Sequence, residues 1–286
     1  MSDRTLPTWL RLILVGTALM QAIFAVTLLA HPEAIDGVWP WRLSPAAARL
    51  LGASTVVSVV LSLLAAAVDR WSAARIPIVM LLTYRVLQLL AGVLHIERFD
   101  FTRPVTWNYF GGGGLMLLIL AYALVRGHTL GRPAAPDRLG GDLPLALGSA
   151  GVFILRAIAV IYFAVGLTYL VLGAQAAWLW FEAPGVLTPL TARLFASPMT
   201  GLALGLWLIT RATYWREVAN PAAGMATFGL AGSLALALEV SRIQPPTAAG
   251  YLTAATPAML LLIGVFLLAQ GRRGLRTVNQ ATVARP

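Results

Sequence analysis

The chain has 286 residues, of which 59% are hydrophobic and 11% charged, and its mean hydropathy is +0.79. This composition excludes an ordinary soluble domain, in which about a quarter of the residues are charged. A net charge of +10 would suggest nucleic acid as the partner of a soluble protein, but the arginines lie mainly between apolar runs, so we expect membrane lipids as partners and no nucleic acid. The absence of cysteine excludes disulfides, thiolate metal sites and cysteine nucleophiles.

Eight apolar runs each have about the 20 residues that a helix needs to cross a hydrocarbon core of about 30 Å. They lie at about 10–30, 46–68, 76–97, 109–126, 151–173, 190–211, 222–241 and 251–270. The first run is longer than the apolar part of a signal peptide, so we interpret it as a retained helix. The sequence therefore predicts an all-α integral membrane protein with eight transmembrane helices.

The two halves of the chain resemble each other at a constant sequence offset. LSPAAARL at 43–50 corresponds to LTPLTARL at 187–194, and the same offset pairs Trp71 with Trp215. Because each half contains four helices, an even number, both halves would enter the membrane in the same direction. This predicts two parallel four-helix repeats.

A polar segment rich in Gly, Pro, Asp and Arg separates the halves, so we divide the chain into a first repeat (1–126), a linker (127–149) and a second repeat with a short basic tail (150–286). Most of the 21 basic residues, all arginine, fall on the side of the linker and the termini. The positive-inside rule then places both termini and the linker in the cytoplasm. The lack of lysine suggests a GC-rich bacterial genome, and hence the cytoplasmic (inner) membrane of a bacterium.

Several local signals predict where helices begin. Ser-Pro at 44–45 and Thr-Pro at 188–189 are typical helix starts, because the hydroxyl can cap a free backbone N–H and proline fits the first helical position. We assign Pro77 and Pro221 the same first-position role in the third and seventh helices. The glycine run 111–114 predicts close packing or a locally unwound turn in the fourth helix.

The outer loops at 31–44 and 174–188 carry amphipathic aromatic side chains, which we expect at the headgroup level of the membrane. These side chains are Trp39, Trp41, Trp178, Trp180 and Phe181.

Arg49 and Arg193 lie in the first turns of the second and sixth helices, where the helix dipole disfavours a cation. Each should therefore have an acceptor within hydrogen-bond reach, either a carboxylate such as Glu239 or a lipid phosphate. One interpretation is a brace between helices. The other is recognition of a substrate or lipid.

The third helix carries a polar stripe. Arg85 lies about 15 Å along the helix from Arg75, near the membrane midplane. At 100° per residue, the polar positions fall on one face together with a glycine; they are Tyr84, Arg85, Gln88, Gly92 and His95. The aligned residues of the second half are mostly apolar or glycine. This difference is expected if one copy became specialised after a duplication. An intramembrane arginine indicates either a ligand site or a structural side chain bonded to neighbouring helices.

Histidines and carboxylates at the outer ends of the first and third helices could converge; they are His31, Glu33, Asp36, His95, Glu97 and Asp100. These ligand types suit a divalent metal, but the short spacings of a strong metal motif are missing. A b-type haem would need paired histidines on facing helices, and only His31 and His95 lie near one surface. We therefore predict no metal and no cofactor, with haem or a divalent metal as alternatives.

The function that we favour from the sequence is non-catalytic: an accessory or assembly subunit of other membrane proteins, or a binder of lipid or another apolar ligand. The second hypothesis is a transporter that uses the Arg85 stripe for an anionic or amphiphilic substrate. The third is a redox or lipid-modifying membrane enzyme with His95 as its acid–base or ligand residue.

Overall fold

The computed structural model describes residues 3–283 except 38, 40, 42, 128, 132–142, 146 and 184, so that much of the predicted linker, including Gly140, lies outside the described residues. Within the described part of the chain, eight helical stretches are long and apolar enough to cross a membrane, and the all-α prediction is confirmed. They are α1 (Thr8–Ala30), α2 (Pro45–Ala67), α3 (Trp71–Leu94), the stretch Pro104–Arg126, α6 (Ser149–Leu172, continued to Leu179 by η4), α7 (Pro189–Ile209), α8 (Trp215–Leu238) and Ala248–Gly271 of α9 (Ala248–Val283).

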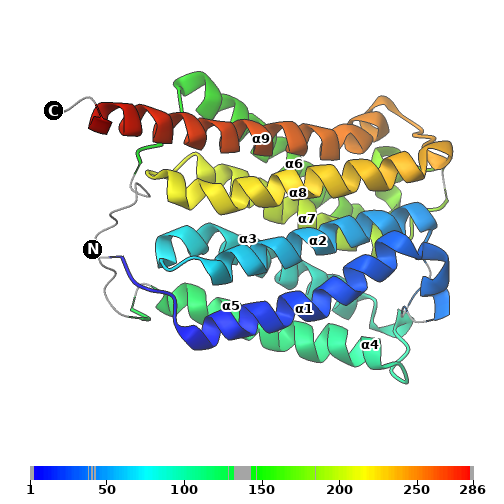
Figure 1. Ribbon diagram of the computed structural model, residues 1–286. Coiled ribbons are helices and arrows are strands. Elements are labelled where there is room, and N and C mark those ends of the chain that lie inside the picture. Colours follow the sequence, from blue (N-terminus) through cyan, green and yellow to red (C-terminus); the bar gives the residue numbers. More distant parts are fainter. Residues whose placement is uncertain are drawn as a thin grey trace.

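The helices lie side by side in one bundle, and the start of α1 and the end of α9 lie at the same end of it (Figure 1). We name this the inner end and the opposite one the outer end. The central helices are α2, α3, α7 and α8, since α3 packs on α7 and α2 on α8. Against this centre lie α1 on α2, α6 on α7 and α9 on α8. The outer helices expose large apolar side chains, such as Ile23 and Leu262, as a lipid-facing surface requires.

Two pairs of elements related by the sequence offset share their bounds. Helices α3 and α8 correspond in this way at both ends, as do the short turns η2 (Ile96–Arg98) and η5 (Val240–Arg242). The first residue of α3, Trp71, packs against Gly127, and the first residue of α8, Trp215, packs against Gly271. These elements and these tryptophan contacts therefore correspond at the sequence offset.

The predicted starts of α2 and α7 are confirmed. Ser44 Oγ accepts a hydrogen bond from the N–H of Ala47 at 3.1 Å, and Thr188 Oγ1 accepts one from the N–H of Thr191 at 3.2 Å. In both helices the following proline occupies the first turn, where it removes no helical hydrogen bond.

The first-position role predicted for Pro77 and Pro221 is wrong, because both lie inside helices that begin at Trp71 and Trp215. Pro77 has no N–H to offer to the carbonyl of Ala73, one turn earlier. The side chain of Asn220, on α8, donates to this carbonyl at 3.4 Å instead. A contact from another helix thus compensates for the proline.

Three of the loop aromatics that we expect at the headgroup level pack inside the protein. Trp39, Trp180 and Phe181 are 9%, 2% and 1% exposed, since the short turns η1 (Pro32–Gly37) and η4 (Gly173–Leu179) fold the loops over the helix ends. Trp178 is 45% exposed and remains available to the membrane surface.

The fourth membrane-spanning stretch is irregular at the glycine run. It consists of α4 (Pro104–Trp107), one π-helical turn η3 (Asn108–Gly112) and α5 (Gly113–Arg126). Turns of this kind are rare and often lie at functional sites.

Candidate functional site

Arg85, on the membrane-spanning helix α3, is half-buried. At 1.5 Å per residue it is about 21 Å from the start of α3 and about 14 Å from its end, so it lies on the outer side of the midplane. The earlier start of α3 explains the difference from the sequence-based depth. Arg85 is still within the hydrocarbon region of a bilayer about 30 Å thick.

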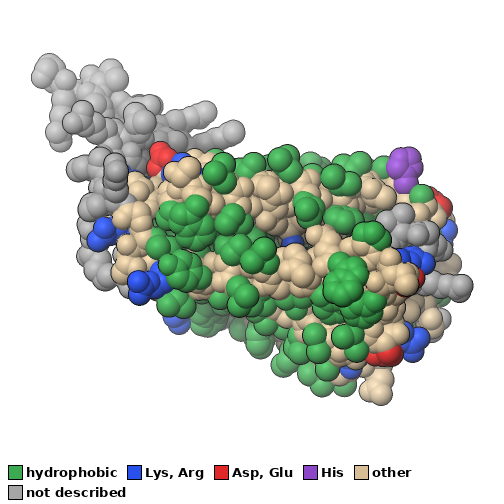
Figure 2. Space-filling model, turned by 90° about the horizontal axis from the view of Figure 1, so that it is seen from below, with side chains coloured by type: hydrophobic (Ala, Val, Ile, Leu, Met, Phe, Trp, Pro, Cys, Tyr) green, Lys and Arg blue, Asp and Glu red, His purple; other side chains and the backbone are tan. Residues whose placement is uncertain are grey.

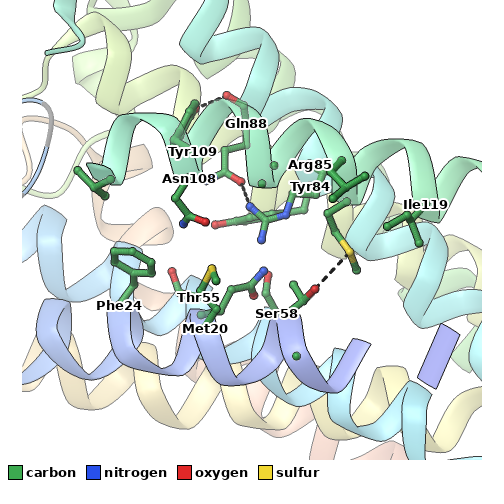
Figure 3. Close-up of a pocket in the computed structure, with 18 of the residues that line it drawn as sticks. Met20, Phe24, Thr55, Ser58, Tyr84, Arg85, Gln88, Asn108, Tyr109 and Ile119 are labelled. Atoms are coloured by element: carbon green, nitrogen blue, oxygen red, sulfur yellow. Dashed lines mark hydrogen bonds between the residues drawn. The ribbon is translucent and has the colours of Figure 1, made fainter. Parts of the chain in front are cut away.

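The side chain of Arg85 lines a pocket of about 310 Å³ in the first half of the chain. The walls come from α1, α2, α3 and the α4–η3–α5 stretch. Figure 3 shows Arg85 and Asn108 pointing into the space that separates them from Met20, Thr55 and Ser58. Apolar side chains, including Ile13, Phe24, Met116 and Ile119, form much of the remaining wall.

The guanidinium of Arg85 has neutral neighbours. Its Nη1 donates to Gln88 Oε1 at 2.6 Å, and its carbon lies 5.8 Å from the ring centre of Tyr84. Tyr109, on η3, donates through its hydroxyl to the backbone carbonyl of Gln88 and so fixes this part of α3 against the irregular stretch. Among the residues that the structure describes, no carboxylate forms an ion pair with Arg85.

Two more polar groups at the pocket are buried without a partner. Gln21, on α1, is 8% exposed, and its Oε1 accepts no hydrogen bond from the described residues. The indole N–H of Trp39, which is 9% exposed, likewise has no acceptor among them. Both residues line the pocket. Leaving a buried polar group unpaired costs about 1–3 kcal/mol, so this pocket provides unused hydrogen-bonding capacity.

The pocket opens sideways toward lipid between α1 and the η3–α5 stretch. Gly16 and Met20 on one side, and Gly112 and Leu115 on the other, both line the pocket and are exposed. An adjoining groove between α1 and α4 is lined by Met20, Ile23, Phe24, Arg103, Pro104, Val105 and Asn108. Figure 2 shows this face, where apolar side chains surround a hollow in which a basic side chain is visible.

The corresponding part of the second half is closed. The cavity among α6, α7, α8 and α9 measures only about 20 Å³. Gly229 is the counterpart of Arg85 at the sequence offset, and a side chain there would collide with the backbone of Leu261 on α9. Tyr162, which lies on α6, donates to the carbonyl of Thr256 at 3.5 Å and joins α6 to α9.

Aligned by their buried faces, α1 and α6 pair Gln21 with Tyr162, three residues away from the sequence offset that relates the later helices. Along α1 the buried residues Leu14, Ala18 and Gln21 follow one another at the same intervals as Leu155, Ala159 and Tyr162 along α6. A tyrosine therefore fills the second half at the position where the first half has a shorter amide.

Arg49 and Arg193 are braces at the outer end. Each Nε donates to a carbonyl of the preceding helix, to Leu29 at 3.1 Å and to Leu170 at 3.0 Å. Each arginine therefore has an acceptor within hydrogen-bond reach, but for Arg193 this acceptor is neither a carboxylate nor a lipid phosphate. Arg49 also forms an ion pair with Glu239, which is 5% exposed.

Arg193 instead contacts His95 Nε2, at 2.5 Å through Nη1. His95 and Glu239 are counterparts at the sequence offset, so each brace joins one half to the other, once through a carboxylate and once through an imidazole. Burial lowers the pKa of His95 first, and the positive charge of Arg193 lowers it further, whereas Glu97 opposes the shift. His95 is therefore held in its neutral form, which can accept a hydrogen bond from Arg193.

The predicted stripe on α3 divides between two places. Tyr84, Arg85 and Gln88 line the pocket, whereas His95 belongs to the brace and Gly92 lies beneath the ring of Tyr109. The grouping of His95 with the stripe is therefore corrected, because at the outer end of α3 the neighbouring helix is α7.

The structure does not assemble the metal site considered from the sequence. Within the described residues, no three histidine or carboxylate side chains lie close enough to hold a metal ion. Asp100 instead accepts hydrogen bonds from the hydroxyl of Thr102 at 2.6 Å and from Nε of Arg103 at 3.0 Å. The Oε1 atom of Glu97 lies 3.8 Å from Nδ1 of His95.

The remaining residues of that group do not join it either. His31 and Glu33 are exposed at the outer end, and the side chain of Asp36 lies outside the described residues.

Sequence reasoning missed Gln21, Trp39, Asn108 and Tyr109 as pocket residues. Gln21 carried a usable signal, because it is an amide within the first apolar run. The other three reach the pocket from a loop and an irregular turn, which helical periodicity does not place.

No protein-family model, curated protein or solved structure matches the chain.

Proposed function

We propose that this protein binds a lipid-like, amphiphilic molecule within the membrane, in the pocket around Arg85. The observation that carries the proposal is a pocket of about 310 Å³ that is apolar, opens toward lipid, and contains an arginine with no acidic partner among the described residues. Its volume lies at the lower end of the range for small-molecule sites, about 300–1,000 Å³.

Energetics supports a ligand over a purely structural role. Placing an arginine at the centre of a membrane helix costs at least about 2.5–3.5 kcal/mol. The hydrogen bond to Gln88 and the contact with Tyr84 offset part of this cost, but Gln21 and Trp39 add unpaired groups at the same pocket. A molecule with an apolar body and a polar head would satisfy all of them.

We further propose that the chain arose by duplication and that its first half was specialised for binding. The shared bounds of α3 and α8 and the matching glycine contacts of Trp71 and Trp215 support this origin. In the proposed topology, the inner end faces the cytoplasm of a bacterium, in agreement with the distribution of arginines.

Transport of the same ligand is a second candidate, favoured by the π-helical turn at Asn108–Gly112. Interrupted membrane helices commonly form the substrate sites of transporters, and here the interruption lies in the pocket wall. Uptake of the bound molecule into proteoliposomes distinguishes a transporter from a protein that only binds the molecule.

The test is to identify what co-purifies with the full-length protein in a mild detergent, by native mass spectrometry and lipid extraction. Gln21→Tyr copies the larger residue of the second half, Tyr162, into the pocket and should remove the bound species. Tyr162→Phe, which keeps the bulk of the closed second half, is the matched control and should retain it. Equal occupancy of both variants would contradict the proposed site.

A further inference from the structure

We infer that the ligand is a single-chain amphiphile with one negative charge, a long-chain carboxylate whose head lies against Arg85 and whose chain leaves between Met20 and Leu115. This inference rests on the proposed function and specifies the class of molecule bound at the same pocket.

The charge of the ligand follows from the charge of the wall. Among the described residues that line the pocket, Arg85 alone is charged. A single anion would neutralise it. A phosphate monoester, which carries nearly two negative charges, would leave an excess charge in a region of low dielectric constant, where uncompensated charge is costly.

The geometry of Arg85 favours a planar acceptor. Gln88 occupies Nη1 and leaves the edge formed by Nε and Nη2 for a two-point contact, the arrangement in which guanidinium binds carboxylate. The amide of Gln21 can present its NH₂ group when its oxygen and nitrogen exchange places, and the indole N–H of Trp39 is also unused. These donors suit the remaining lone pairs of a carboxylate.

The opening connects the pocket with the lipid-facing surface. Glycine occupies a rim position on each side, Gly16 on α1 and Gly112 on η3, and a side chain added at Gly16 would have no atom within 4 Å. Beyond this rim, Met20 and Leu115 are 52% and 61% exposed and continue into the lipid-facing surface. A hydrocarbon chain can therefore remain in the membrane while its head occupies the pocket.

The experiment uses the full-length protein in phosphatidylcholine vesicles and a long-chain fatty acid brominated on its chain. Bromine quenches indole fluorescence, and Trp39 lies at the pocket, so binding is measured as the component of quenching that Trp39→Phe removes. The brominated alcohol and alkyl phosphate of the same chain length are the comparison probes. The fatty acid should bind about 10- to 100-fold more tightly than the alcohol, the ratio expected for hydrogen bonds to a charged group.

Arg85→Gln should reduce fatty-acid affinity to about that of the alcohol. Arg156→Gln, which removes a membrane arginine of the second half, should change neither. Equal binding of acid and alcohol to the wild type, or tighter binding of the alkyl phosphate, would overturn the carboxylate assignment while the proposed pocket stands. If none of the three probes quenches Trp39 and Gln21→Tyr loses no co-purifying species, the proposed function itself fails.

Discussion

The two outer braces predict unequal costs for the same substitution at corresponding positions of the two halves. Both Arg49→Ala and Arg193→Ala remove one hydrogen bond to a backbone carbonyl, so this loss cancels in the comparison. Arg49→Ala also leaves Glu239, with a side chain 6% exposed, without its main partner. Breaking a buried ion pair from one side costs about 3–5 kcal/mol.

The expected loss for Arg49→Ala is about 3 kcal/mol, at the lower end of that range, because Arg242 Nε still contacts Glu239 at 2.8 Å. Arg193→Ala leaves only the neutral His95 without its donor, and we expect about 1.5 kcal/mol. Equilibrium unfolding of the full-length protein in mixed micelles, with increasing dodecyl sulfate, measures both. Adding Glu239→Gln to Arg49→Ala should recover part of the loss. An equal or larger loss for Arg193→Ala would refute this reasoning.

Three further predictions concern packing, pH and topology. Gly229→Ala should lower the free energy of unfolding by about 1–3 kcal/mol because the added methyl meets the α9 backbone, whereas Gly16→Ala should not lower it; equal effects would contradict the closed second half. Because the folded protein lowers the pKa of His95 from its ordinary value of about 6.5, the unfolded chain takes up the proton first as the pH falls. The free energy of unfolding should therefore decrease below about pH 6.5, and His95→Gln should remove this component; an unchanged pH profile would argue against it. In intact cells, an impermeant thiol reagent should label a cysteine at Thr102 and not at Thr129, and the reverse would invert the proposed topology.

The fold could be predicted from the sequence wherever a signal is local. Apolar runs of membrane-spanning length identify helices without knowledge of their neighbours. The caps at Ser44 and Thr188 similarly act within one turn of their helices. The start of α3 could not be predicted in this way, because the proline inside α3 is compensated by Asn220, which lies in the other half of the chain.

Of the candidate site, only the part that α3 contributes was predictable from the sequence: Tyr84, Arg85 and Gln88. The cost of an arginine in a membrane helix identifies Arg85 from its position alone. Periodicity could not show that His95, on a similar face of α3, contacts α7 instead of the pocket. Nor could it show that Gln21 and Tyr109 come together around Arg85, since this depends on how α1 and η3 pack against α3.

Binding of a long-chain carboxylate at Arg85 is tested most directly by photo-cross-linking with a fatty acid that carries a diazirine on its chain, in vesicles containing the full-length protein. Adducts mapped by mass spectrometry should concentrate on α1 and α5 near Met20 and Leu115, and Arg85→Gln should greatly reduce them. Adducts spread equally over the lipid-facing surfaces of both halves, with no effect of Arg85→Gln, would contradict binding at this site.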